Sequence, residues 1–230
     1  MRLERPASFT TRQTHCFRGG RRPKRMKQVL KKIGDWLART LVVPCAVGYW
    51  CARVLFGSNK AFPGWSQLMS LFPGLIGIYL RRAFYWWVFP RCDSGAAICF
   101  GTVFSHPTCS IGRNVYVGVF SCLGDVTLED DVLVGSHVSI MNGSGQHGTA
   151  RLDVPIREQP GVWPHITIGR DTWIGDRAIV MANVGRHCVI GAGSVVTKPI
   201  PDFAVAAGSP AKVIRYRTES GEPSSVGNAG

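Results

Sequence analysis

Residues 166–201 read ITIGRDTWIGDRAIVMANVGRHCVIGAGSVVTKPIP, and an aliphatic residue followed by glycine returns there at Ile168-Gly169, Ile174-Gly175 and Ile190-Gly191. The six-residue step between the first two pairs fits neither a helical turn of about 3.6 residues nor the alternation of a long strand. Short strands joined by tight corners produce such a period, so the pattern predicts a β-solenoid. In such a coil about three hexapeptides make a triangular turn, with aliphatic side chains inside and small residues at the corners.

The composition predicts one globular domain with an appendage. The chain has 230 residues and 45% hydrophobic content, which is enough for a substantial core without a disulfide framework. Its eight cysteines are scattered, with no Cys-x-x-Cys pair and no histidine spacing typical of zinc. We therefore expect reduced thiols in a cytosolic protein and no metal ion.

The net charge of +13 suggests nucleic acid until it is divided along the chain. Residues 1–35 carry 11 Lys/Arg against 2 acids, residues 36–91 carry 6 against none, and residues 92–230 carry 10 against 12. The excess therefore lies entirely before the repeats, in a basic tail and an apolar segment. This distribution favours an anionic membrane surface as a partner and argues against nucleic acid.

The first 91 residues divide into a tail and an apolar segment. Residues 1–26 are basic and interrupted by Gly and Pro, so we expect disorder, although residues 1–25 could also be an over-extended reading frame that starts properly at Met26. From Lys27 an apolar stripe recurs every three or four residues, which predicts an amphipathic helix. The stripe consists of Val29, Leu30, Ile33, Trp36, Leu37, Thr40 and Leu41.

Richer apolar sequence follows this helix. Residues 40–52 carry no charge but are too few for a helix that spans a bilayer, and Pro44 should bend the chain. In residues 61–80, Pro63-Gly64, Pro73-Gly74 and Gly77 should interrupt any single helix. Arg81 to Pro90 then joins a cationic pair to aromatic residues, as interfacial anchors do. We expect residues 27–91 to associate with the membrane, most simply by lying on it; a true span, or a cap on the solenoid or between subunits, remains open.

The solenoid domain is assigned to residues 92–217, with a polar, frayed tail at 218–230. The period breaks after Ile140 and resumes at Ile166, which leaves residues 141–165 as an excursion long enough to be functional. The step from Val180 to Ile190 is short, and Lys198-Pro-Ile-Pro201 should end the repeat because proline lacks an N–H donor. A strand, a turn at Gly208-Ser-Pro210 and a cationic end should follow. The predicted inward residues are Ile98, Phe104, Ile111, Val117, Leu123, Leu128, Val134, Ile140, Ile168, Ile174, Val180, Ile190 and Val196.

The chain resembles the hexapeptide-repeat acyltransferases, particularly the maltose, galactoside and xenobiotic O-acetyltransferase group. The resemblance covers about residues 98–217 and is carried by IGRDTWIG at 168–175, IGAGSVVTK at 190–198 and AGSPAKVI at 207–214. It implies an all-β fold, a left-handed parallel β-helix, with active sites between the subunits of a homotrimer. It also implies transfer of an acetyl group from acetyl-CoA to a hydroxyl.

The resemblance implies that a histidine in the excursion is the catalytic base, and His147 holds that position in GSGQHG at 143–148. A hydroxyl is a weak nucleophile, and an imidazole that titrates near neutral pH can remove its proton during attack on a thioester. A backbone N–H or the substrate-binding side chain of Asn142 would then stabilise the oxyanion. The other histidines in the repeat domain (His106, His137, His165 and His187) are expected to be solvated or bonded to backbone, and their spacing does not fit a shared metal site.

The positions expected to bind the cofactor, acetyl-CoA, follow from the same motifs. Ala192 would let the pantetheine arm approach the backbone, with Thr197 and Lys198 beside it. Lys212 and Arg215 would meet the phosphates, although a solvated basic edge explains them too. Trp173 would line the pantetheine tunnel or fill a gap between coils, and Asp176 departs from the small residue that relatives have there.

The favoured function is O-acetylation of a sugar in a surface polysaccharide or lipid-linked glycan, at the cytoplasmic, inner face of the cell membrane. Acetylation of a small diffusible acceptor, such as a free sugar or a drug hydroxyl, is a second hypothesis. A trimeric membrane scaffold without enzymatic activity is the third. The residues that would choose the acceptor match no specific substrate pattern.

Overall fold

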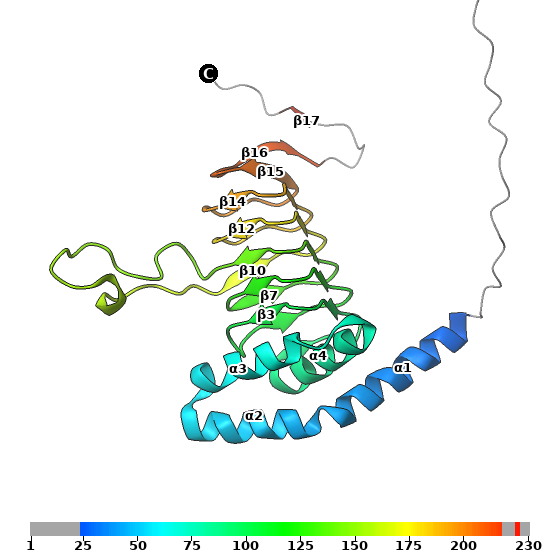
Figure 1. Cartoon of the computed structure of the whole chain (residues 1–230). Helices are drawn as coiled ribbons and strands as arrows, with labels where there is room; N and C mark the ends of the chain where they lie inside the picture. Colours follow the sequence, from blue (N-terminus) through cyan, green and yellow to red (C-terminus); the bar gives the residue numbers. More distant parts are fainter. Residues whose placement is uncertain (1–23, 218–223, 226–230) are drawn as a thin grey trace, which may run out of the picture.

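The computed structural model describes residues 24–217 and 224–225, which form a parallel β-solenoid with helices at its N-terminal end (Figure 1). The helices are α1 (Lys24–Leu41), α2 (Val43–Phe56), α3 (Ser58–Ser70) and α4 (Gly74–Val88), and a 3₁₀ turn, η1 (Ile156–Glu158), lies in the excursion. The predicted tail at 1–26 lies outside the described residues, apart from 24–26, which belong to α1.

The strands form three faces, one for each sheet. Face A holds β1 (Arg91–Cys92), β4 (Ser110–Ile111), β7 (Val126–Leu128) and β10 (Ile166–Ile168). Face B holds β2 (Ala97–Ile98), β5 (Tyr116–Val117), β8 (Leu133–Val134), β11 (Trp173–Ile174), β13 (Val189–Ile190), β15 (Ala204–Gly208), β16 (Ala211–Tyr216) and β17 (Ser224–Ser225). Face C holds β3 (Val103–Phe104), β6 (Cys122–Leu123), β9 (Ser139–Ile140), β12 (Ile179–Val180) and β14 (Val195–Val196).

The corners are named here by the faces that they join. Corner AB holds residues 93–96, 112–115, 129–132, 169–172, 185–188 and 202–203. Corner BC holds residues 99–102, 118–121, 135–138, 175–178 and 191–194. Corner CA holds residues 105–109, 124–125, 141–165, 181–183 and 197–199, and the excursion therefore leaves from this corner.

The inward positions of the coils match the sequence prediction. All thirteen predicted aliphatic and aromatic residues are at most 2% exposed, so their side chains fill the prism. Each one contributes about 1.5–3 kcal/mol by leaving water. Glycine follows many of them because the next coil lies directly above: a Cβ at Gly175 would lie 2.5 Å from the backbone nitrogen of Ala192.

The upper coils are shortened on face A, as the short step from Val180 to Ile190 predicts. There the ladder reduces to single bridges that join Ile168 to Val184 and Val184 to Ile200. The predicted end of the repeat at Pro201 is wrong, because β15 still pairs in parallel with β13. The prolines do not stop the ladder, since the bond at this level is donated by the N–H of Ile200, between them, to Asn183 O at 3.0 Å.

The chain then reverses. β16 pairs antiparallel with β15 after the turn at Gly208-Ser-Pro210, as expected. In the tail predicted to be frayed, β17 adds two residues to the edge of β16. The rest of residues 218–230 lies outside the described part of the chain.

Helix α4 closes the open end of the first coil, which decides one of the alternatives for residues 81–90. Arg81, predicted to lie at a membrane interface, is fully buried and donates from Nε to Ile98 O at 2.8 Å and from Nη1 to Phe72 O at 2.6 Å. Burial lowers the pKa of this guanidinium from its ordinary value. Arg82 donates to Ala96 O and forms a buried ion pair with Asp35 of α1. These residues therefore act as a cap on the solenoid.

Two proline and glycine predictions for the helices are also corrected. Pro63 lies inside α3 and does not end it, whereas Pro73 does separate α3 from α4. Gly77 continues α4, and a Cβ there would overlap the carbonyl oxygen of Phe72. Gly77 therefore allows the backbone of α4 to pack closely against the carbonyl group of Phe72.

Helices α1 and α2 form an arm across the base of the cap (Figure 1). The bend between them is 43°, close to Pro44 as predicted. The predicted apolar stripe of α1 faces outward: Trp36 and Leu41 are each 69% exposed, while the small Ala38 is buried. By length and composition, none of the described helices could cross a bilayer alone, and only the bent pair of α1 and α2 passes that test.

Candidate active site

Asn142 anchors the excursion to corner CA. Its side chain accepts a hydrogen bond from Asp125 N at 2.9 Å and donates to Asp125 O and Pro164 O, each at 2.9 Å. The residue is 2% exposed, and its one amide joins the two ends of the excursion to each other and to the coil below. Both amide N–H donors of Asn142 are thereby used within one chain, and its substrate-binding role remains a prediction.

His165 reinforces this anchor at the end of the excursion. Its Nδ1 lies 3.0 Å from Asp125 Oδ1, and its Nε2 lies 2.8 Å from Thr127 Oγ1. The same carboxylate oxygen accepts a hydrogen bond from Thr108 at 2.6 Å, one coil lower. The imidazole of His165 thus bonds to side chains, whereas the sequence predicted that it would contact solvent or backbone.

The excursion has internal structure of its own. Gln159 is buried and donates to Arg151 O at 2.7 Å and to Val154 O at 2.9 Å, which draws the tip of the loop together. The N–H of Val162 donates to Gly145 O at 2.8 Å, so the outgoing and returning segments of the loop run side by side there. Gly161 permits this approach, since a Cβ there would lie 2.8 Å from His147 N.

His147 is therefore presented from an ordered loop. Its ring is exposed and meets Trp163 edge-on, with ring centroids 5.8 Å apart. No carboxylate of the described residues pairs with its imidazole, so an exposed ring nitrogen can accept a proton from a bound hydroxyl. Figure 1 shows the excursion, residues 141–165, projecting well beyond the coils.

Three predicted cofactor residues frame face C near the top of the solenoid. Ala192 lies at corner BC beside Gly193, whose φ is 68°. Thr197 and Lys198 lie at corner CA and are exposed. The register places β9, β12 and β14 in one column, so Thr197 and Lys198 lie two coils above the start of the excursion.

The other predicted cofactor residues lie on face B, opposite corner CA. Trp173 projects outward from β11 and is 54% exposed. Lys212 and Arg215 lie on β16, at the end of the same face. A single chain therefore does not bring His147 together with Trp173, Lys212 and Arg215.

Trp173 borders an open hollow of about 300 Å³ on face B, lined also by Asp131, Asp171 and Arg217. A larger hollow of about 500 Å³ lies on the upper part of face A, next to Lys198, with Asn183, Pro199 and Asp202 in its wall. Sequence reasoning missed Arg217 and Asp171 as residues that border the first hollow. The sequence signal that could have found them is an acidic residue at one corner followed by a basic residue at the next, as Asp171 is followed by His187.

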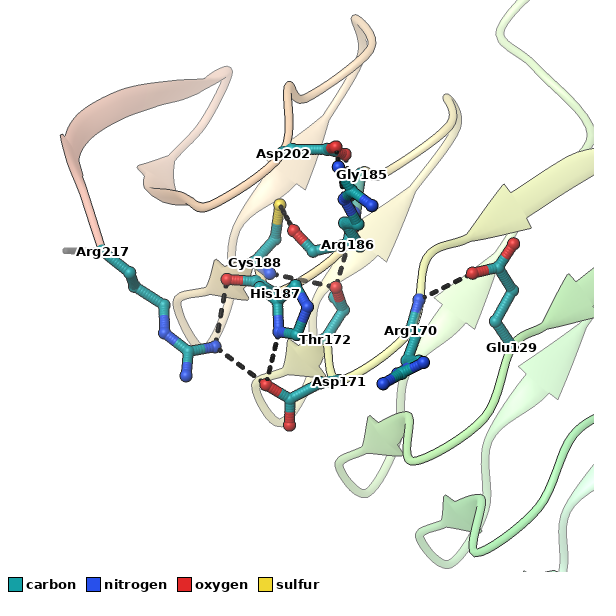
Figure 2. Close-up of polar contacts among 10 residues, drawn as sticks. All are labelled: Glu129, Arg170, Asp171, Thr172, Gly185, Arg186, His187, Cys188, Asp202 and Arg217. Atoms are coloured by element: carbon teal, nitrogen blue, oxygen red, sulfur yellow. Dashed lines mark hydrogen bonds and ion pairs between the residues drawn. The ribbon is translucent and has the colours of Figure 1, made fainter. Parts of the chain in front are cut away.

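Figure 2 shows that polar pairs run up corner AB, and four of the residues drawn also line these hollows: Asp171, Arg186, Asp202 and Arg217. Asp171 accepts from His187 Nδ1 at 2.9 Å, and this hydrogen bond lowers the pKa of the Asp171 carboxyl. Arg217 donates to His187 O at 3.0 Å, and Arg186 donates from Nε to Asp202 at 2.8 Å. Each corner is thus fixed by the one above it, and the walls of both hollows are held in place.

The remaining histidines are also held by side chains. His106 Nδ1 lies 2.9 Å from Ser105 Oγ, and His137 stacks on Phe120 with ring centroids 5.4 Å apart. No group of three or more His, Cys, Asp or Glu residues in the described part of the chain is arranged to hold a metal ion.

Known proteins share the sequence of the repeat region. Residues 165–198 match the family model described as bacterial transferase hexapeptide (six repeats). The galactoside O-acetyltransferase of Escherichia coli is 40% identical over 111 residues, which are 46% of this chain and 52% of that protein. A probable acetyltransferase of Mycobacterium tuberculosis is 36% identical over 121 residues, which are 52% of this chain and 39% of that protein. The chain thus spans about half or less of the length of these two relatives.

Solved structures share the solenoid. A maltose O-acetyltransferase from Clostridium difficile superposes with a TM-score of 0.62 at 21% identity, over 72% of this chain and 89% of that one. A galactoside acetyltransferase in complex with coenzyme A gives a TM-score of 0.55 at 24% identity, over 71% of this chain and 84% of that one. These likenesses establish the fold class, the left-handed parallel β-helix of hexapeptide-repeat proteins.

Proposed function

We propose that the protein transfers an acetyl group from acetyl-CoA to a sugar hydroxyl, with His147 as the general base. The observation that carries the proposal is the excursion itself, which presents an exposed imidazole from the corner that also holds Thr197 and Lys198. The names of the similar proteins, galactoside and maltose O-acetyltransferase, support the acceptor class.

In the proposed reaction the imidazole of His147 takes the proton of the sugar hydroxyl as its oxygen attacks the thioester carbonyl. A tetrahedral oxyanion forms, and backbone N–H groups donate to it, or Asn142 does so after releasing Asp125 O or Pro164 O. The C–S bond then breaks, the ester is released, and the imidazolium returns its proton to the thiolate of coenzyme A. The proton balance closes without a further co-reactant.

The active site is proposed to form between copies of the chain. His147 lies on the excursion at corner CA, whereas Trp173, Lys212 and Arg215 lie on the opposite face. A homotrimer in which the excursion of one subunit reaches face B of its neighbour would complete the site. Sedimentation of the full chain would test this arrangement, since a monomer that is active at nanomolar concentration would exclude it.

The acceptor is proposed to be a surface polysaccharide or lipid-linked glycan on the cytoplasmic face of the cell membrane. The outward apolar face of α1 and α2, flanked by exposed Lys31, Lys32 and Arg53, supports attachment to an anionic bilayer. Glycan mass spectrometry of cells with and without the gene would test the acceptor. An unchanged acetyl pattern would count against a glycan and favour a small diffusible acceptor.

The direct test of the mechanism is His147→Ala in the full chain. We expect kcat for acetyl transfer to fall by about 10²–10⁴, the range for losing a general base, with coenzyme A affinity and assembly size unchanged. His106→Ala is the matched control, because it removes another imidazole from corner CA and should leave kcat unchanged. Full activity in His147→Ala would show that this residue is not part of the mechanism. If the unaltered protein does not bind coenzyme A, the result would favour a scaffold without enzymatic activity.

A further inference from the structure

A hollow of about 420 Å³ lies where the helices meet the first coil. It is bounded by α2, by the end of α4 and by the lowest part of corner CA. Its wall includes Trp50, Arg53, Trp87, Pro90, Pro107 and Thr108.

The wall combines apolar surface with one cation. Trp50 and Trp87 are 42% and 41% exposed, and the indole N–H of Trp87 donates to Arg39 O at 3.3 Å, which fixes that ring. The guanidinium of Arg53 lies over the Trp50 ring, 4.7 Å from its centroid. None of the carboxylates in the described residues forms an ion pair with Arg53. The carboxylate of Asp125, which bonds to Thr108 in the wall of the hollow, is also engaged by His165. This combination suits one anionic group carried on an apolar chain.

Exposed apolar residues follow the hollow on α2. Val54, Leu55 and Phe56 follow Arg53 directly and are all exposed. An alkyl or isoprenoid chain attached to an anion at Arg53 could therefore lie against the same arm that faces outward at Trp36 and Leu41. Burying such a chain gains about 0.8 kcal/mol for each methylene removed from water.

The hollow lies directly below the excursion. β3, β6 and β9 are in register, so the corner that bears Pro107 and Thr108 is two coils below the one that bears Asn142. Thr108 bonds to Asp125, and Asp125 bonds to Asn142, which links the three levels. Adjacent coils are about 4.8 Å apart, so roughly 10 Å separates the hollow from the base of the loop that carries His147.

We infer that this hollow binds the phosphate of a membrane-anchored, lipid-linked acceptor. Arg53 holds the phosphate, Trp50 and Trp87 pack against the first carbons of the lipid, and the attached sugars extend along corner CA towards His147. The inference rests on the proposed function, and it adds a subsite that selects lipid-linked over free sugars.

The test is isothermal titration calorimetry of the full chain with farnesyl phosphate, which carries one phosphate on an apolar chain. We expect Arg53→Gln to weaken binding by at least tenfold; Arg53 is exposed, so the substitution leaves the core intact. Lys60→Gln is the matched control: it removes the same charge from α3, outside the hollow, and should change affinity by less than twofold. Equal losses in both variants would overturn the inference, because they would indicate only general attraction of anions.

Further titrations distinguish the source of the phosphate. Inorganic phosphate and farnesol should each bind at least tenfold more weakly than farnesyl phosphate, and equal binding by either would overturn the inference. Full displacement of farnesyl phosphate by phosphatidylglycerol vesicles would also overturn the inference, because the hollow would then hold a bilayer lipid and not the acceptor. These titrations contain no acetyl-CoA, and His147→Ala should bind farnesyl phosphate normally. If the hollow does not bind farnesyl phosphate, the acetyl-transfer proposal still stands. If acetyl transfer is not found, binding of farnesyl phosphate can still be measured.

Discussion

The solenoid and the α1–α2 arm are both rich in large apolar residues, but they place them oppositely. Inside the prism Ile174 and its counterparts are sealed from water, whereas on the arm Trp36 and Leu41 point away from the protein. Burial makes the first set responsible for stability. The second set gains nothing from burial within this chain, which is why we propose that it contacts a membrane.

The two regions meet at α4, where Arg81 and Arg82 replace apolar contacts with hydrogen bonds to carbonyl groups at the edge of the first coil. A solenoid end leaves its backbone groups and core unprotected, so a cap is required. The arm is attached to this cap through the ion pair of Arg82 with Asp35.

The largest effect is expected from Ile174→Ala inside the solenoid. The substitution leaves a cavity in a stacked core that cannot collapse, and the free energy of unfolding should fall by about 2–5 kcal/mol. Urea denaturation followed by circular dichroism measures it. A loss below about 1 kcal/mol would mean that this coil is not packed as described.

A smaller loss is expected from Arg81→Met at the junction. Methionine keeps much of the apolar stem but leaves the carbonyl oxygens of Ile98 and Phe72 without their donor, which should reduce the free energy of unfolding by about 1–3 kcal/mol. Thermal unfolding of Arg81→Met beside Lys60→Met, an exposed site, measures the difference. Equal melting temperatures would show that the guanidinium is not needed to attach the cap.

Trp36→Ala on the arm should leave stability unchanged within about 0.5 kcal/mol, as for other exposed positions. Its effect should appear with vesicles of phosphatidylcholine and phosphatidylglycerol, where losing one buried large apolar side chain weakens binding by about tenfold or more. Co-sedimentation measures the affinity. Undiminished binding would show that the stripe on α1 does not contact lipid.

The smallest effect concerns acid stability at corner AB. Hydrogen bonds from the backbone N–H and the guanidinium of Arg113 lower the pKa of Asp130 to about 2. Because the folded pKa is depressed, this stabilisation is complete above the unfolded pKa of about 4 and is lost as pH falls towards 2. The melting temperature of the unaltered protein should therefore fall more steeply between pH 4 and 2 than that of Asp130→Asn; parallel curves would contradict the assignment.

Much of the fold could be predicted because inward positions in a solenoid repeat with a fixed period. The excursion could be predicted as well, since the period stops at Ile140 and returns at Ile166. The end of the repeat could not, because whether Pro201 breaks a ladder depends on which N–H groups the ladder uses. The function of Asn142 as an anchor was likewise hidden, since its partners Asp125 and Pro164 are distant in sequence.

The local sequence was sufficient for the coil, the helix of residues 27–41 and the loop that carries His147, because each depends on periodicity or on its interruption. Only the tertiary structure decided which face of that helix points outward, that Arg81 and Arg82 are buried in a cap, and that corner CA aligns the lower hollow with the excursion. Those features depend on contacts between residues far apart in the chain, for which a local pattern of residue types carries no signal.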